Sequence, residues 1–388
     1  MMIFGVINDV LFVLLGFAVG YLFLFAVASL PRRKEHFPRA KKCARFLTLI
    51  PAYKGDEVVE AAIRSAVGQE YPTELHTVMV IADHFRAETL ERLARDYPSV
   101  QVLAVNFEDS SKAKALSYAV MQLSDDVADV VVILDVDNVA APDCLQLFND
   151  AYASGVEAMQ AHRTARNRDT DMAVLDAVSE EINNSIFRRG HTALGLSSAL
   201  IGSGMAFKYS WFRNHIDRCM TAGEDKELEA MLLQEEVYID YLENAVVLDE
   251  KVQKEGAFYN QRRRWLAAQV GALTRGIRDL PKALFDGNWD YADKLVQWML
   301  PPRVLLLGFI LLCALCTTFL MPLWSIRWWF LLLLLAFALA FATPDEQMDK
   351  PLRRALRRLP ILFLLMVANL FRLRGAGHKF IHTQHEEL

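Results

Sequence analysis

Two uncharged runs of membrane-spanning length limit what this chain can fold into more than any other feature. They extend from Val10 to Leu30 and from Val304 to Trp324, and each has twenty-one residues. A helix of about 20 residues crosses a hydrocarbon core about 30 Å thick. A third uncharged run, Trp328 to Thr343, follows the second after only Ser325-Ile326-Arg327. The last two runs therefore predict a helical hairpin.

Positive charges around these runs predict an orientation. The first run is too long for a signal peptide, and Arg32, Arg33 and Lys34 follow it, which places the N-terminus outside and the following chain in the cytoplasm. The later segment Pro360–Phe371 is apolar for only twelve residues between arginines. This length favours an interfacial or re-entrant helix, and if the segment crossed the membrane, the tail from Arg372 would lie outside.

Composition adds three limits. Apolar residues make up 53% of the 388 residues, yet 23% are charged, so a large water-soluble part must accompany the apolar runs. A net charge of −5 gives no reason to expect nucleic acid as a partner. Five cysteines without framework spacing favour a reducing compartment, and the pair Cys313 and Cys316 lies in an apolar run, which favours helix packing over zinc or redox chemistry.

Short β-branched runs alternate with helical stretches between residue 46 and about 275. The expected strands are Phe46-Pro51, Thr77-Ala82, Val100-Val105, Val130-Leu134 and Val156-Ala161, and the expected helices are Asp56-Gly68, Lys112-Leu123 and Pro142-Tyr152. This alternation predicts an α/β fold with a mainly parallel sheet covered on both faces. Ligands of such sheets bind at the carboxyl ends of the strands.

The same patterns divide the chain into five parts. We expect a transmembrane anchor at 1–31, a cytoplasmic catalytic domain at 32–275, an amphipathic interface segment at 276–303, a transmembrane hairpin at 304–343 and a basic cytoplasmic segment at 344–388. The interface segment carries Trp289, Tyr291 and Trp298 among polar residues. Aromatic side chains of this kind prefer the membrane surface, so we expect the pocket to open towards the bilayer.

Two carboxylates follow the most apolar strand. The run Val130-Leu134 leads directly into Asp135-Val136-Asp137. Alternate residues of an extended segment point the same way, so Asp135 and Asp137 can reach one ligand together. Carboxylate oxygens suit a hard divalent cation such as Mg²⁺ or Mn²⁺, although a bare DxD more often caps a helix or lies in a loop.

Several short motifs occur in an order typical of one enzyme family. They are Pro51-Ala52-Tyr53, Gln69-Glu70-Tyr71-Pro72, Asp83, Asp135-Val136-Asp137, Glu224-Asp225 and Gln261-Arg262-Arg263-Arg264-Trp265. In this order, over residues 46 to 270, the chain resembles family-two glycosyltransferases. It is most similar to the membrane-bound cellulose, hyaluronan and poly-N-acetylglucosamine synthases, with ceramide glucosyltransferases as relatives. The resemblance implies a GT-A fold, a UDP-sugar donor, a divalent metal and inversion at the anomeric carbon.

The resemblance also implies roles for the donor-binding residues. Asp83 matches the aspartate that hydrogen-bonds uracil, with Ala52 and Tyr53 in the neighbouring base and ribose pocket. From spacing alone, Asp83 is equally a helix N-cap before Phe85. Lys112 matches a lysine that approaches the nucleotide phosphates. Asp135 and Asp137 face the nucleotide and the metal, with Asp137 as the expected direct ligand.

On the acceptor side, Asp225 matches the general base of a TED-type motif and Glu224 the residue beside it that contacts the acceptor. A plain acidic helix start explains the same two residues, and both interpretations can hold.

The QxxRW-type motif supplies the remaining expected contacts. Gln261 and Arg264 are expected at the diphosphate, and Trp265 is expected under an acceptor sugar. An arginine-rich helix on anionic lipid is the alternative, above all for Arg262 and Arg263. Ser203 and Gly204 resemble a small-residue segment beside the acceptor, or a plain turn. The tail Lys379–His385 resembles a WxxT-type segment with phenylalanine in place of tryptophan, or is a solvated tail.

The sequence thus favours a multi-pass enzyme of the cell membrane that adds sugar to a glycan, as polysaccharide synthases do. A non-processive enzyme acting on a lipid or lipid-linked acceptor remains almost level with it, because few membrane helices are present to form a polymer channel. A non-catalytic subunit of a glycan-secretion complex is a third possibility. A homo-oligomer or secretion partners are compatible with all three.

Overall fold

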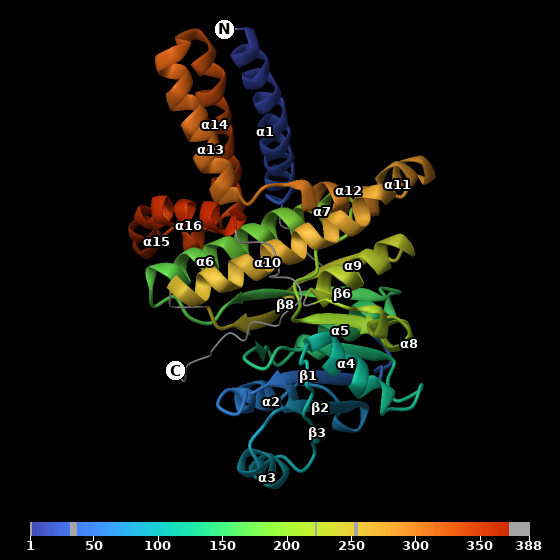
Figure 1. Ribbon diagram of the computed structural model, residues 1–388. Coiled ribbons are helices and arrows are strands. Elements are labelled where there is room, and N and C mark those ends of the chain that lie inside the picture. The colour runs from blue at the N-terminus through green and yellow to red at the C-terminus, as the bar shows by residue number, and fades with distance from the viewer. Residues whose placement is uncertain (1, 32–36, 222, 252–254, 372–388) are drawn as a thin grey trace.

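The computed structural model describes residues 2–31, 37–221, 223–251 and 255–371, and these form three layers (Figure 1). Three long apolar helices stand together at one end of the molecule. A layer of helices lies across their base, and a β-sheet lies beyond that layer.

The strands of the described residues form one eight-stranded sheet in the order β3-β2-β1-β4-β7-β6-β8-β5. They are β1 (Phe46–Tyr53), β2 (His76–Asp83), β3 (Gln101–Val105), β4 (Val130–Ile133), β5 (Val139–Ala140), β6 (Ala158–Ala165), β7 (Met205–Lys208) and β8 (Ile239–Asp249). β7 pairs antiparallel with both β4 and β6, so β6 and β8 run in the same direction as β1 to β4. Six strands therefore end at one edge, which confirms the expected α/β fold.

All five expected strands are present, but the second half of the sheet contains more. The last expected strand begins at Ala158 and continues to Ala165. β5, β7 and β8 were not predicted. β7 has only four residues, and β8 carries Glu243 and Asn244 at a register shift that interrupts its apolar pattern.

The helices around the sheet are α2 (Val59–Val67), α3 (Ala87–Asp96), α4 (Lys112–Met121), α5 (Cys144–Ala153), α8 (Tyr209–Arg213) and α9 (Glu224–Gln234). Alternate strand residues enter separate cores on the two faces. Leu47 and Leu49 of β1 pack into one core, and Phe46 and Ile50 pack into the other. Burial on both faces explains why these strands read as continuous apolar runs.

The middle layer and the apolar helices contain the remaining elements. They are α6 (Asp171–Asn183), α7 (His191–Ala193), α10 (Glu255–Gly276), α11 (Leu280–Asp286), α12 (Trp289–Met299), α15 (Lys350–Ala355), α16 (Leu359–Phe371), and the long apolar helices α1 (Met2–Ala28), α13 (Arg303–Leu320) and α14 (Pro322–Ala342). A π-helical segment, Asn184–Gly190, joins α6 to α7. Short 3₁₀ turns occupy Thr73–Leu75, Ile216–Arg218, Ile277–Asp279, Asp345–Gln347 and Leu356–Arg358.

Three of the described helices are long and apolar enough to cross a membrane: Gly5–Ala28, Arg303–Leu320 and Pro322–Ala342. The turn of the hairpin differs from the prediction, because α13 ends before Met321 and Pro322 begins α14. Arg327 therefore lies on α14, where it donates to Asp9 at 2.7 Å and stacks on the Trp324 ring. Proline in the first turn, rather than the nearest charge, determines where the second helix begins.

The interfacial elements agree in part with expectation. α16 lies across the base of α13 and α14 in Figure 1, as expected of an interfacial helix. Of the three aromatic side chains expected at the membrane surface, only Trp289 is exposed. Tyr291 and Trp298 are buried against the sheet-containing part, which corrects that prediction. All five cysteines are free, and the tail Lys379–His385 lies outside the described residues.

The first helix is fixed to the middle layer by a close backbone contact. A Cβ atom placed on Gly190 would lie 2.3 Å from the carbonyl oxygen of Phe25 in α1. Next to it, the His191 ring stacks on Phe25 with centroids 3.6 Å apart. Only glycine allows α1 to approach the π-helical segment this closely.

We expect Gly190→Ala to lower the free energy of unfolding in detergent by about 1–3 kcal/mol, because the added methyl group has no space. Thermal unfolding of the purified chain measures the change. Gly20→Ala is the matched control, since nothing lies within 4 Å of that position on α1. Equal stability of the two variants would show that the contact does not matter.

Candidate active site

A cavity of about 1030 Å³ opens at the edge where the parallel strands end. It contains the ends of β1, β2 and β4, the start of α9 and one face of α10. Its other side is lined by apolar residues of α1, α6, α13, α14 and α16. One space therefore connects the edge of the sheet with the base of the three apolar helices.

The end of β2 contributes Asp83 to this cavity. Its side chain is buried, and Oδ1 accepts a hydrogen bond from the backbone N–H of Phe107 at 3.2 Å and contacts Nδ1 of His84 at 2.6 Å. Asp83 does not cap α3, which begins at Ala87 without a side-chain cap. The N-cap interpretation is therefore wrong. Ala52 and Tyr53, at the end of β1, line the same part of the cavity.

The residues that directly follow β1 and β2 both have left-handed backbone angles. Lys54 has φ 49° and His84 has φ 59°, a region that residues with a side chain seldom occupy. Such conformations concentrate at binding sites, where the surrounding structure enforces them. Nothing in the sequence marked these positions.

Asp135 and Asp137 follow β4 and both line the cavity. The backbone N–H of Asp135 donates to Ser203 Oγ at 2.9 Å. Asp137 Oδ1 accepts from Nδ2 of Asn138 at 3.1 Å, and the same amide donates to Asp249 at 2.9 Å. Asn138 thus joins the Asp-x-Asp segment to the end of β8.

Lys112 is the centre of the polar part of the cavity. Its ammonium group forms a close ion pair with Asp135, donates to the carbonyl oxygen of Gly202 at 2.6 Å and lies 3.4 Å from Glu224. It therefore links the acidic segment after β4 with the acidic start of α9. A phosphate contact by Lys112, as the resemblance implies, has to replace one of these partners.

Glu224 and Asp225 form the first turn of α9 and both line the cavity. Burial, the largest effect, raises the pKa of Glu224 to about 7; Lys112 opposes this rise, whereas the negative charges of Asp225 and Asp135 add to it. Asp225 Oδ1 accepts from the backbone N–H of Lys226 at 2.9 Å. The helix-start interpretation is thus confirmed, and it does not remove Asp225 from the cavity.

The side chains of Gln261, Arg264 and Trp265 on α10 also line the cavity. Arg262 forms a close ion pair with Asp176 of α6, and its guanidinium lies 4.7 Å from the centre of the Trp265 ring. Arg262 therefore faces the interior of the protein, which contradicts the alternative that it lies against anionic lipid. Gln261 Oε1 is buried without a hydrogen-bond partner in the described part of the chain.

Ser203 and Gly204 lie behind the site rather than on it. Ser203 is completely buried, and its hydroxyl binds the backbone of Asp135. Gly204 has φ +64°, and a Cβ atom there would lie 3.0 Å from Ala161 and 3.1 Å from Val247. Direct contact with an acceptor, the expected role of both residues, is therefore corrected to support of the loop that carries Asp135.

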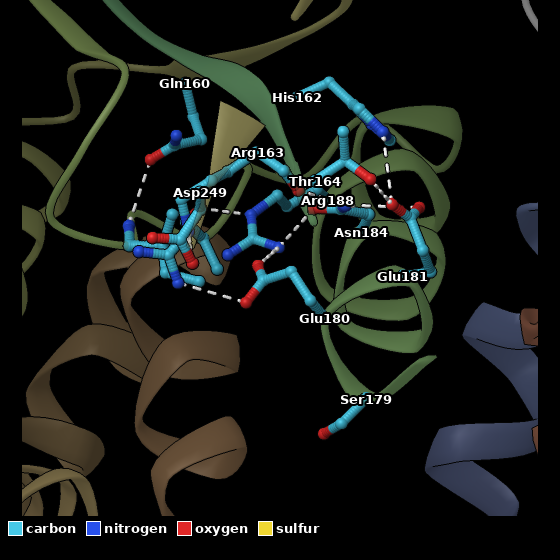
Figure 2. Close-up of polar contacts among 12 residues, drawn as sticks. Gln160, His162, Arg163, Thr164, Ser179, Glu180, Glu181, Asn184, Arg188 and Asp249 are labelled. Atoms are coloured by element: carbon cyan, nitrogen blue, oxygen red, sulfur yellow. Dashed lines mark hydrogen bonds and ion pairs between the residues drawn. The ribbon is translucent and has the colours of Figure 1, made fainter. Parts of the chain in front are cut away.

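A buried network of charged side chains lies at one side of the cavity, which Arg163, Arg188 and Asp249 line (Figure 2). Arg163 of β6 lies 3.1 Å from Glu180 of α6 and 3.8 Å from Asp249 of β8. Arg188 of the π-helical segment lies 3.3 Å from Glu180. Burial alone raises the pKa of Glu180, but the surrounding cations, Arg163 foremost, outweigh it and hold that pKa far below its usual value.

This network was not predicted from the sequence. Asp249 was detectable, because the run Val246-Val247-Leu248 leads into it as Val130–Leu134 leads into Asp135. Arg163, Glu180 and Arg188 had no such signal, since only the packing of α6 on the sheet brings them together.

The acidic residues fit a divalent cation that is shared with a ligand. No group of three or more His, Cys, Asp or Glu side chains suited to a metal occurs among the described residues. Magnesium-like ions are commonly held by one or two carboxylates together with water and phosphate oxygens. Asp137 and Asp135 can supply these carboxylates, and Asp137 is the better placed of the two because Asp135 already pairs with Lys112.

We expect Glu224→Gln to alter how stability depends on pH. A carboxyl whose folded pKa is raised stabilises the fold less as pH rises from its unfolded pKa of about 4.5 to about 7, by about 1.4 kcal/mol per unit. The glutamine variant has no carboxyl to titrate at this position. Its melting temperature should therefore rise relative to that of the wild type between pH 5 and pH 8. A constant difference across this range would contradict the raised pKa.

The chain matches the family model "Glycosyl transferase family group 2" over residues 130–342, which is more than half of its length. The structure is similar to that of mannosyltransferase PcManGT from Pyrobaculum calidifontis, solved with GDP-Man and Mn²⁺. The TM-score is 0.55 and the identity 19%, over 94% of this chain and 99% of the other. At this identity the similarity shows a shared fold.

A second solved structure, residues 1–349 of TarS from S. aureus with UDP, gives a TM-score of 0.38 at 13% identity. It covers 57% of this chain and 64% of that one, and the score is too low to support an argument. No curated protein matches the sequence. The match to the family model covers most of the cavity-forming chain from β4 onwards, including the acidic segments and α10. The chain therefore belongs to glycosyl transferase family group 2.

Proposed function

We propose that this protein transfers a sugar, with inversion, from a nucleoside-diphosphate sugar to an acceptor held at the membrane surface. The observation that carries the proposal is that Asp137, Asp225 and Trp265, far apart in sequence, line one cavity. PcManGT was solved with GDP-Man and Mn²⁺, which supports a sugar nucleotide and a divalent cation for this chain. The resemblance to polysaccharide synthases favours UDP as the nucleotide.

In this proposal the donor lies along the carboxyl edge of the sheet. Ala52, Tyr53 and Asp83 bind the base and ribose, since they line the cavity at the ends of β1 and β2. Gln261 and Arg264 contact the diphosphate, to which an arginine offers a planar set of donors. A bound Mg²⁺ or Mn²⁺, held by Asp137 with support from Asp135, would stabilise the negative charge of the leaving diphosphate.

Asp225 is the proposed general base. The acceptor hydroxyl oxygen forms a bond to the anomeric carbon while the bond from that carbon to the diphosphate oxygen breaks. Asp225 takes the hydroxyl proton, and the bonding electrons leave with the nucleoside diphosphate. Glu224, whose pKa is close to neutral, lies beside it and is proposed to hydrogen-bond the acceptor.

The apolar side of the cavity favours a lipid or lipid-linked acceptor. Leu22, Ile182, Leu339 and Met366 line it, and they belong to α1, α6, α14 and α16, of which α1 and α14 are candidate spans. A growing polysaccharide needs a polar path instead. Mass spectrometry of the product separates these functions: one added sugar supports a lipid acceptor, a ladder supports a polymer, and nucleotide binding without transfer supports a non-catalytic subunit.

We expect Asp225→Asn to reduce the transfer rate by about 10²–10⁴-fold, because the amide cannot take the proton. Release of nucleoside diphosphate from a panel of UDP- and GDP-sugars, with purified membrane protein and lipid extract, measures the rate. Asp217→Asn is the control, since Asp217 is an exposed carboxylate near α9 that does not line the cavity. Donor affinity should be unchanged in both variants, and full activity of Asp225→Asn would exclude the assigned base.

Turnover should stop when EDTA removes divalent cations and should return with Mn²⁺ or Mg²⁺. Asp137→Asn should raise the metal concentration needed for half-maximal activity by at least about tenfold, because the cation loses a carboxylate ligand. Asp143→Asn, an exposed carboxylate outside the cavity, serves as the control. Activity that persists in EDTA would argue against a metal in this reaction.

A further inference from the structure

Three arginines lie at the part of the cavity nearest the apolar helices. Arg188 comes from the π-helical segment, Arg262 from α10, and Arg303 from the first turn of α13. The positive charges of Arg262 and Arg188 act unfavourably on Arg303, and the negative charge of Glu180, which pairs with other cations, offsets part of this. A cluster of like charges in a poorly hydrated space requires compensating negative charge.

Two of these arginines already have that compensation. Arg188 pairs with Glu180, and Arg262 pairs with Asp176. Arg303 has no carboxylate within ion-pair distance among the described residues. One of its terminal nitrogens, Nη2, donates to the backbone and hydroxyl oxygens of Ser179, both at 2.9 Å. The other, Nη1, is buried without a hydrogen-bond partner in the same part of the chain.

The position of Arg303 on its helix also favours a bound anion. It is the first residue of an 18-residue apolar helix whose N-cap, Pro302, supplies no side-chain acceptor. The N-terminus of a helix carries partial positive charge and unpaired backbone N–H groups, so a cation there is unfavourable and an anion is favourable. An anion at this point would satisfy both the helix end and the unpartnered guanidinium nitrogen.

The surroundings indicate what carries this anion. Val304 and Leu307 of α13, Val178 and Ile182 of α6 and Leu362 of α16 line the cavity around Arg303. A free anion gains nothing from such side chains, whereas an alkyl or isoprenyl chain gains by burying its surface against them. The bound molecule should therefore combine an anionic group with a long apolar chain.

We propose that Arg303 and the N-terminus of α13 bind the phosphate of a long-chain phosphate ester, the acceptor lipid of the transfer reaction. The identification of this lipid as the acceptor rests on the proposed function. Binding of the lipid requires neither a sugar donor nor turnover. The phosphate lies at Arg303, and the apolar chain extends along α6, α13 and α16. Sugar transfer then takes place at the polar end of the same cavity, near Asp225.

Binding to the full-length protein in detergent tests the proposal without any sugar donor. The probes are a long-chain polyprenyl monophosphate, the corresponding polyprenol, and inorganic phosphate, each titrated while thermal unfolding is followed. The polyprenyl phosphate should bind at least about tenfold more tightly than either of the others, because only it has both the charge and the chain. Equal binding of polyprenol would overturn the phosphate site, and equal binding of inorganic phosphate would overturn the lipid.

Variants assign the site to Arg303. Arg303→Gln should weaken binding of the polyprenyl phosphate by at least about tenfold and leave polyprenol binding unchanged. Arg303→Lys keeps the charge but loses the planar pair of donors, so it should fold even if the glutamine variant does not, and it should bind several-fold more weakly. Arg357→Gln is the control, since Arg357 is exposed beside α16 and does not line the cavity. Unchanged affinity in either Arg303 variant, or equal weakening in Arg357→Gln, would refute the assignment.

A failure of this test differs from a failure of the proposed function. If the protein transfers sugar but does not prefer the phosphate ester, the acceptor is of another class and the lipid-phosphate site is wrong. If it prefers the phosphate ester, loses that preference in the Arg303 variants and transfers no sugar, the site stands and the catalytic proposal is wrong.

Discussion

The contact of Lys112 with Asp135 and Glu224 is the interaction on which the site depends. Negative charges from the end of β4 and the start of α9 repel each other in a largely buried place, and the ammonium group offsets that repulsion. Because this lysine opens α4, three separate segments meet at one point. The cavity keeps its acidic wall only while they remain together.

The cavity also depends on how the sheet is joined to the apolar helices. The buried network around Glu180 ties α6 to β6 and β8, and Gly190 lets α1 pack on the segment that continues α6. A charged network of this kind is costly to break, because each removed partner leaves an unpaired charge in the interior. The polar and apolar ends of the cavity are therefore held in one fixed arrangement, as the proposed transfer to an acceptor at the membrane surface requires.

Local patterns predicted the parts of this structure that local physics determines. The strand before Asp135, the helix from Lys112 and the three apolar helices each follow from residues adjacent in sequence. The partner of Lys112, the burial of Ser203 and the charge cluster at Arg303 depend on contacts between distant segments, which no periodicity reveals. Arg262 is an example. Its charge was compatible with a contact to anionic lipid, but the packing of α10 against α6 places it beside Asp176.

The most direct test of the shared cavity is an experimental structure with Mn²⁺ and the preferred nucleoside diphosphate, in which anomalous scattering locates the metal. The account predicts a manganese peak beside Asp137, in contact with the diphosphate, with the Asp225 carboxylate facing the same space. A metal bound elsewhere, or an Asp225 side chain turned away from the nucleotide, would contradict it.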